Sequence, residues 1–104
     1  MDYKVIVSEL AETQLDQIVF YILHVLNNEQ AAVSVLEDAE DTKRRLAHVA
    51  GSLKFCDSFG LRELGYRTIH FKQHQYIMVY RIHDNEVHVE GIYHDLQDYE
   101  NILQ

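Results

Sequence analysis

Apolar residues recur along the chain with two different periods, and these periods distinguish predicted helices from predicted strands. Residues 3–7 are mostly β-branched or aromatic, which is typical of a strand. After Ser8, a good helix N-cap, apolar side chains recur at helical spacing. They are Ala11, Leu15, Ile18, Ile22 and Val25, with Val19 and Leu26 widening the stripe. The pattern therefore predicts a strand followed directly by an amphipathic helix.

A second helical stripe runs from about Glu29 to His48, after a turn at residues 26–30 that contains two asparagines. Its apolar positions are Ala32, Val35, Leu36, Ala39, Leu46 and Val49. Acidic residues precede basic ones along it, which suits the helix dipole, and Gly51 is a candidate C-cap. Because the turn is short, we expect an antiparallel helical hairpin. In it, Ala32, Val35, Leu36 and Ala39 should meet Leu15, Ile18 and Ile22.

The second half of the chain alternates short strand-like runs with hairpin-length joints. After a predicted loop over 51–60, strands are expected at 66–72, 75–83 and 86–94. Residues 61–64 either add a short strand or begin the first of these. The tail from Asp95 is predicted to form a last helical turn with Asp95 as its cap. The order is β-α-α-β-β-β.

This order predicts one α+β domain over residues 1–104, with an antiparallel sheet and a helical hairpin on one face. Both faces of the later strands carry apolar side chains. The face away from the helices therefore needs another cover, which suggests a partner protein. On the first helix, Phe20, Tyr21 and Leu23 lie off the main stripe, where they either edge the core or contact a partner.

The net charge and the absence of cofactor motifs reduce the number of function classes that the sequence fits. The chain has nine Lys plus Arg against 17 Asp plus Glu, a net charge of −8, which opposes strong binding to nucleic acid. Seven histidines lack metal-ligand spacing, and Cys56 is the single cysteine, so no metal site or cofactor is expected. The longest apolar run, residues 18–23, is too short to span a membrane. With no signal-peptide pattern, a cytoplasmic location is expected.

Three local patterns give this order a family resemblance. They are "YKVIVSELAETQLDQIVFYI" at the start, "LRELGYR" leading into "QYIMVYRI", and "EVHVEGIYHDLQDY" at the end. Together they resemble the RelE/ParE superfamily of bacterial type II toxins over nearly the whole chain. His94, followed by Asp98 and Tyr99, is more similar to the ParE branch. The resemblance implies a toxin held inactive by a cognate antitoxin, as a homodimer or as a heterotetramer with it.

Two branches of the superfamily imply different actions. ParE-like members inhibit growth by acting on DNA gyrase, and this is the function that we expect here. RelE-like members cut mRNA on the ribosome, which is the alternative. A third possibility is a relative that is not toxic and only binds its antitoxin. The net charge of −8 favours the first and third possibilities over the second.

The nuclease alternative assigns two catalytic residues. By resemblance, Arg67 would hold the scissile phosphate and His94 would transfer a proton. Asp95 follows His94 where one nuclease branch has a tyrosine, which favours a capping or hydrogen-bonding role for His94 instead. Arg67 has an equally open alternative, an ion pair with Glu63 or Glu90 at a sheet edge.

Basic residues near the Gly-Tyr-Arg turn form a predicted binding patch. It comprises Lys54, Arg62, Arg67 and Arg81, together with Tyr80. For Arg81, a structural ion pair is the expected role, because its neighbours Ile77 and Val79 on the same strand face are apolar. We expect the patch to grip an acidic segment of a partner rather than to cut RNA.

Overall fold

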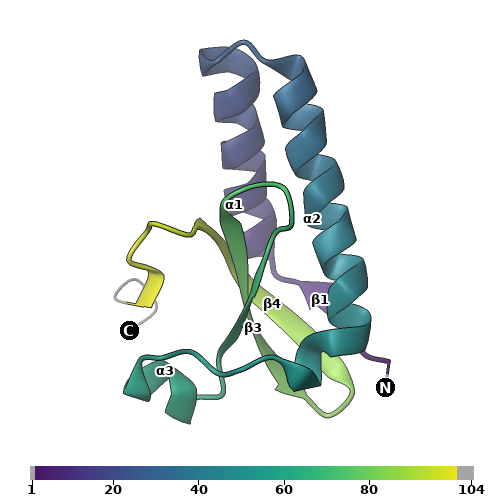
Figure 1. Cartoon of the computed structure of the whole chain (residues 1–104), viewed down its shortest axis with the longest axis vertical. Helices are drawn as coiled ribbons and strands as arrows, with labels where there is room; N and C mark the ends of the chain where they lie inside the picture. Colours follow the sequence, from purple (N-terminus) through teal and green to yellow (C-terminus); the bar gives the residue numbers. More distant parts are fainter. Residues whose placement is uncertain (1, 101–104) are drawn as a thin grey trace.

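The computed structural model describes residues 2–100 and contains a mixed four-stranded sheet with a helical hairpin against it (Figure 1). Its elements are β1 (Lys4–Val7), α1 (Glu9–Phe20), the π-helical turn η1 (Tyr21–Val25), α2 (Glu29–Val49), the 3-10 turn η2 (Ala50–Ser52), α3 (Phe59–Glu63), β2 (Arg67–His70), β3 (Tyr76–His83) and β4 (Glu86–His94). The predicted β-α-α-β-β-β order is confirmed, with α3 as an addition.

The two long helices begin at polar N-caps, of which Ser8 was predicted from the sequence. Ser8 Oγ accepts a hydrogen bond from the Ala11 amide at 3.1 Å, and Asn28 Oδ1 accepts one from the Ala31 amide at 3.0 Å. Each bond satisfies an amide that has no partner within its helix. The caps fix where α1 and α2 start, and so they fix which side chains face the sheet.

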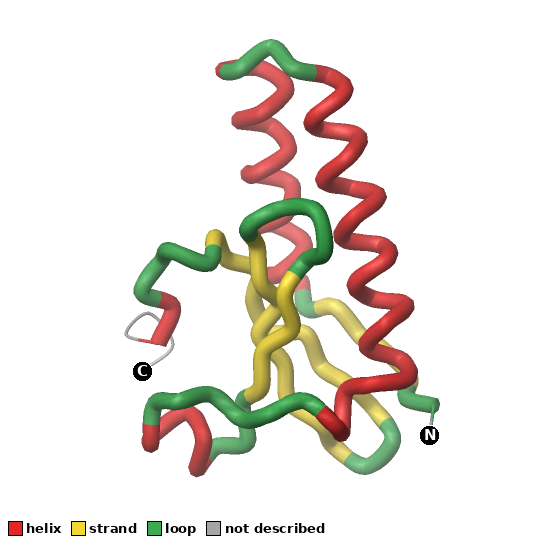
Figure 2. Tube along the Cα trace, in the orientation of Figure 1, coloured by secondary structure: helices red, strands yellow, loops and turns green. Residues whose placement is uncertain are grey.

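The helical hairpin has its own small core. Ile22, Ala32 and Val35 are buried there, and Leu15, Ile18 and Val19 pack against them. The predicted hairpin contact is thus confirmed for these residues, but Leu36 is 41% exposed. Because one residue advances about 100° around a helix, Leu36 lies beside the buried stripe of Val35 and Ala39 rather than within it. Figure 2 shows that the joined ends of the helices extend well beyond the sheet.

The strands are ordered β1-β4-β3-β2, and the sheet is mixed. β1 runs parallel to β4, whereas β4, β3 and β2 pair antiparallel, so the predicted all-antiparallel pairing is wrong for β1. The β3–β4 register shifts at Val79/Tyr80: Val79 pairs with Gly91 and Tyr80 with Val89. Glu90 is the extra residue of this bulge, and the bulge lets Val89 and Ile92 face the same core.

The chain itself covers one face of the sheet and part of the other. The main core lies between the helices and one face and includes Leu46, Met78, Tyr80, Val87 and Val89. A second core covers part of the other face, where Cys56 and Leu61 pack with Tyr66, Val79 and Tyr93. The expectation that this face needs a partner to cover it is therefore wrong for the part under residues 56–66, because α3 and its flanking loop fold over it.

Three local predictions also need correction. Gly51 is not a left-handed C-cap, because the helix continues into η2; a Cβ there would stand 2.5 Å from the Tyr3 hydroxyl. Residues 61–63 are helical rather than strand-like, and the turn that follows at Leu64 uses Gly65 at a φ of +86°. In the tail, helix begins at Tyr99, so Asp95 is not its cap, and residues 101–104 lie outside the described residues.

Candidate functional site

Arg67, the first residue of β2, joins the sheet to the end of the long helix α2. Its Nη1 donates to the carbonyl oxygens of Leu53 at 2.7 Å and Gly51 at 2.9 Å, and lies 3.4 Å from that of Ala50. The guanidinium carbon stands 4.0 Å from the centre of the Phe55 ring. Carbonyls at a helix C-terminus lack intrahelical donors and carry partial negative charge, so a cation there is favourable.

The contacts of Arg67 differ from the ion pair considered from sequence. Glu90 pairs with Arg81, and the groups that accept from Arg67 are backbone carbonyls. This partner set could not be derived from periodicity, because it depends on the end of α2 returning to the start of β2.

Tyr80, directly opposite Arg67 in the register, shares one of these acceptors. Its buried hydroxyl donates to the Ala50 carbonyl at 2.8 Å. Burial raises the pKa of Tyr80 to about 12, and the neighbouring Arg67 guanidinium opposes part of that rise. Tyr80 and Arg67 therefore act together to hold η2 against the sheet.

Arg81 lies on the opposite face of the sheet from Arg67. Its Nε donates to Glu90 Oε2 at 2.6 Å, its Nη2 donates to Oε1 at 3.3 Å, and its guanidinium carbon stands 4.6 Å from the Tyr66 ring centre. The Tyr66 hydroxyl donates to the same carboxylate at 3.1 Å. The hydrogen bond with Glu90 raises the pKa of Arg81. The ion pair predicted for Arg81 is therefore present, built on the extra residue of the bulge.

The predicted basic patch is divided between surfaces. Arg62, on α3, lies over the exposed Phe59 ring at 5.9 Å, and Lys54 is exposed in the loop before α3. Arg67 and Arg81 point to opposite faces because their strand neighbours alternate. The structure thus does not gather the four cations into one site. A hollow of about 610 Å³ lies beside Arg81, lined also by Glu90, His83 and His88.

His94, the last residue of β4, is engaged in the turn that follows it. Its Nδ1 accepts from the Leu96 amide at 3.1 Å and lies 3.4 Å from Asp95 Oδ1. Its ring meets that of Tyr76 edge-on, with the ring centres 5.5 Å apart. An Nδ1 that accepts a hydrogen bond belongs to the tautomer with its proton on Nε2.

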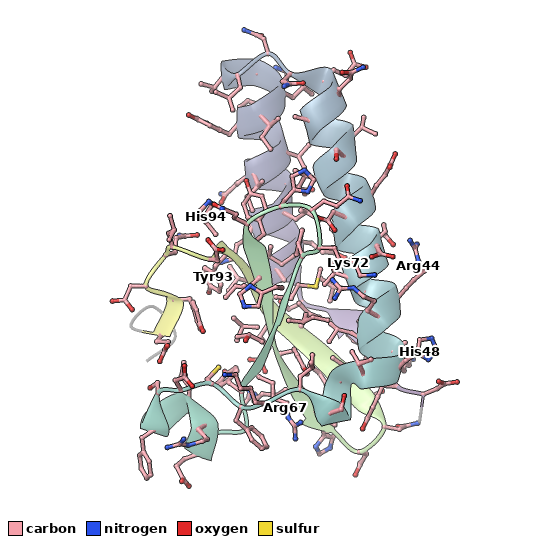
Figure 3. All side chains as sticks on the ribbon, in the orientation of Figure 1. Arg44, His48, Arg67, Lys72, Tyr93 and His94 are labelled. Atoms are coloured by element: carbon pink, nitrogen blue, oxygen red, sulfur yellow. The ribbon has the colours of Figure 1, made fainter. Side chains whose placement is uncertain are left out.

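Arg67 and His94 are far apart. Arg67, on β2, is opposite Tyr80 of β3, and His94, on β4, is opposite Tyr76 of β3. The two positions are therefore four residues apart along β3, and the two side chains belong to the strands on either side of it. Four residues of strand span roughly 13 Å. Figure 3 shows the two side chains toward opposite ends of the sheet.

Sequence reasoning missed a buried polar cluster between α2 and the β2–β3 loop. The Asp38 side chain is only 2% exposed. It accepts from the Lys72 amide at 3.2 Å, the Gln73 amide at 2.9 Å and His74 Nδ1 at 2.7 Å. Its position in the sequence could have indicated this burial. Asp38 lies one helical turn from Val35 and Thr42, on the buried side of α2.

Residues 2–100 contain no group of three or more His, Cys, Asp or Glu placed to hold a metal ion. In the same range, no helix is long and apolar enough to cross a membrane. Cys56 is buried, and burial raises its thiol pKa, so it lacks the environment of a reactive thiolate.

We expect Tyr80 to titrate late and its contribution to stability to be lost at strongly alkaline pH. Its folded pKa lies above the ordinary value near 10, so its contribution is complete below about pH 10 and is lost as pH rises toward 12. Tyr80→Phe should cost about 1 kcal/mol at pH 7. It should also remove one late tyrosinate from a spectrophotometric titration. Tyr99, whose pKa burial also raises to about 12, serves as the internal reference. An unchanged late titration in Tyr80→Phe would contradict this assignment.

Comparison with known proteins places the chain in a family. Residues 5–99 match the family described as the ParE toxin of the type II toxin–antitoxin system parDE. Among solved structures, the fold is similar to a chain of a chromosomal ParDE toxin–antitoxin system from P. aeruginosa. The identity is 20%, the TM-score is 0.73, and the match covers 88% of this chain and 95% of that one. No curated protein matches. Because the family match covers nearly the whole chain, this protein belongs to the ParE family of type II toxins.

Proposed function

We propose that this toxin arrests growth by acting on DNA gyrase in the cytoplasm and that a cognate antitoxin neutralises it. Family membership supports a toxin. Two arguments support gyrase as the target: the resemblance of the sequence to the ParE branch, and the poor fit of Arg67 and His94 to RNA cleavage.

One observation carries the choice between gyrase and RNA: the separation of Arg67 from His94. A phosphate-binding cation and a proton donor must reach the same reacting phosphodiester, within hydrogen-bond distance of its oxygens. Here Arg67 and His94 pair with positions of β3 that are four residues apart, on opposite sides of that strand, and Nη1 of Arg67 is engaged by carbonyl oxygens. This arrangement supports a toxin that acts by binding its target.

The charge of the chain agrees with that choice. A net charge of −8 repels RNA, and the loop before the sheet offers one lysine, Lys54. A protein target, in contrast, can be recognised through apolar and acidic surfaces. We therefore propose that binding to gyrase, rather than hydrolysis, produces the toxic effect.

The proposal is tested by inducing the full chain in bacteria and by measuring covalent gyrase–DNA complexes and mRNA 5′ ends in parallel. We expect complexes to accumulate and mRNA ends to stay as in uninduced cells. Co-expression of the protein encoded beside the toxin gene should restore growth.

His94→Gln is the informative variant, because a Gln side-chain oxygen can still accept from the Leu96 amide. We expect it to remain as toxic as the wild type. Ribosome-dependent mRNA cuts that disappear in His94→Gln would overturn the proposal in favour of the nuclease. Absence of growth arrest by the folded wild type would instead indicate a relative that is not toxic.

A further inference from the structure

Ser34, His74 and Asp38 form a chain of polar contacts between α2 and the β2–β3 loop, residues 71–75, which reaches α2 in Figure 1. Asp38 Oδ2 lies 2.7 Å from His74 Nδ1, and His74 Nε2 lies 3.4 Å from Ser34 Oγ. Ser34 and Asp38 are four residues apart on α2, so their side chains lie on the same side of the helix, where one imidazole contacts both. A carboxylate, an imidazole and a hydroxyl thus follow one another as in a Ser-His-Asp triad.

The imidazole of this chain is oriented from its buried end. The Asp38 side chain is 2% exposed and that of His74 is 23% exposed, whereas Ser34 is half-buried. The amides of Lys72 and Gln73 hold the carboxylate in place. Because an ionised carboxylate only accepts, it places the imidazole proton on Nδ1 and leaves the Nε2 lone pair for the Ser34 hydroxyl. A distance of 3.4 Å to that hydroxyl is long, but catalytic hydrogen bonds often shorten only when substrate binds.

A hollow of about 350 Å³ lies beside Ser34. Gln30, Val33 and the carboxylates of Glu29 and Glu37 line it together with Ser34. Gln30 precedes Ser34 by one helical turn, so its carboxamide can donate to an oxygen of a molecule in the hollow. Val33 is 47% exposed and offers an apolar contact. The two carboxylates repel anions, so the hollow fits a small uncharged ester.

We propose that Ser34 is a nucleophile that takes an acyl group from small uncharged esters, with His74 as its general base and Asp38 as a positioning residue. Ser34 Oγ forms a bond to the ester carbonyl carbon while its proton passes to His74 Nε2. Negative charge develops on the carbonyl oxygen, to which the Gln30 carboxamide donates. When the carbonyl forms again, the bond to the leaving oxygen breaks, and that oxygen takes the proton from His74. The products are an acyl ester of Ser34 and a free alcohol.

The test treats the purified, folded chain with p-nitrophenyl acetate. Absorbance measures the release of p-nitrophenolate, and peptide mass spectrometry locates the acetyl group. We expect the acetyl group on Ser34, and a release at least about tenfold faster than in Ser34→Ala. Ser52→Ala is the matched control, because Ser52 is exposed and donates to the Val49 carbonyl rather than to an imidazole. It should react at the rate of the wild type.

Two further variants test the roles of the neighbouring side chains, and circular dichroism verifies that each variant folds. His74→Ala should slow acetylation of Ser34 by about a hundredfold, a typical contribution of a general base. Gln30→Ala leaves the chain of polar contacts intact and should slow acetylation by about tenfold or more.

Heavy water distinguishes proton transfer from a purely structural role. Acetylation of Ser34 should be slower in heavy water in the wild type, because the hydroxyl proton moves during the attack. This difference should disappear in His74→Ala and in Asp38→Asn, whose imidazole is no longer held in the required tautomer. Acetylation of Ser34 no faster than that of the exposed Ser52, or equally fast in folded His74→Ala, would overturn the proposal. The three side chains would then only attach the β2–β3 loop to α2, and the proposed action on gyrase would be unaffected.

Discussion

Replacing Arg67 with alanine should lower the free energy of unfolding by about 2–3 kcal/mol, even though the side chain is only partly buried. The substitution removes charged hydrogen bonds to the carbonyls of Gly51 and Leu53, and hydrogen bonds to charged groups contribute about 1.5–3 kcal/mol. It also removes the contact with the Phe55 ring. For a domain of this size the melting temperature should fall by roughly 10–20 °C.

Urea denaturation of Arg67→Ala and Arg44→Ala provides the comparison. Arg44 is exposed on α2, with its Nη2 3.6 Å from Asp41, and a surface pair of this kind contributes about 0.5 kcal/mol or less. Arg67→Lys should fall between Ala and the wild type, because an ammonium keeps the charge but not the planar guanidinium that stacks on Phe55. Equal stability of Arg67→Ala and Arg44→Ala would show that the contacts of Arg67 with η2 do not hold the fold.

A stability role changes how loss of toxicity in Arg67→Ala should be interpreted. The variant can lose activity because η2 separates from the sheet, without any contact between Arg67 and a phosphate. Toxicity should therefore be compared at a temperature at which circular dichroism shows that both proteins are folded. His94→Gln perturbs the fold less, which makes it the cleaner test of the nuclease alternative.

Elements with strong periodicity could be predicted from the sequence, whereas contacts between distant segments could not. The cap Ser8 acts within one helical turn, so local pattern was sufficient to place it. The strand at 86–94 was predicted with its observed bounds. In contrast, the parallel pairing of β1 with β4 depends on how the whole chain folds back, which no local period encodes.

The partners of the candidate site residues also could not be predicted from local sequence patterns. Arg81 was predicted to form an ion pair because its strand neighbours are apolar, but the identity of Glu90 as partner depends on the bulge at Val79/Tyr80. Strand alternation alone cannot reveal an inserted residue. Arg67 was singled out by resemblance, while its acceptors lie in η2 and at Leu53 just after it, 14 to 17 residues earlier. Residue type thus identified the important side chains, and tertiary structure determined their partners.

Asp38 is the second position where a single substitution should have a large effect. Burial by itself raises the pKa of the Asp38 carboxyl, but hydrogen bonds from His74, Gln73 and Lys72 outweigh burial and hold the pKa below its usual value. The carboxylate thereby attaches the β2–β3 loop to α2, near Lys72 in Figure 3. Because Asp38 accepts only, His74 must present a proton on Nδ1. Its Nε2 then lies 3.4 Å from Ser34 Oγ.

We expect Asp38→Ala to lower the free energy of unfolding by about 3 kcal/mol at pH 7. The alanine removes the carboxylate that accepts from the Lys72 and Gln73 amides and from His74, and hydrogen bonds to a charged group contribute about 1.5–3 kcal/mol. Asp38→Asn keeps the shape and one acceptor oxygen, so its cost should be smaller, about 2 kcal/mol. Glu37→Ala, one residue away on the exposed side of α2, is the matched control and should change stability by about 0.5 kcal/mol or less.

The pH dependence separates the charge of Asp38 from its shape. Because the folded pKa is below the ordinary value near 3.9, the stabilisation by the carboxylate is complete above that value. It is lost as pH falls through the folded pKa, when the carboxyl takes up a proton and no longer accepts at both oxygens. The stability difference between wild type and Asp38→Asn should therefore shrink below about pH 4. Urea denaturation at pH 7, 5 and 3 measures it, and a difference that persists unchanged at pH 3 would mean that packing, rather than ionisation, accounts for the role of Asp38.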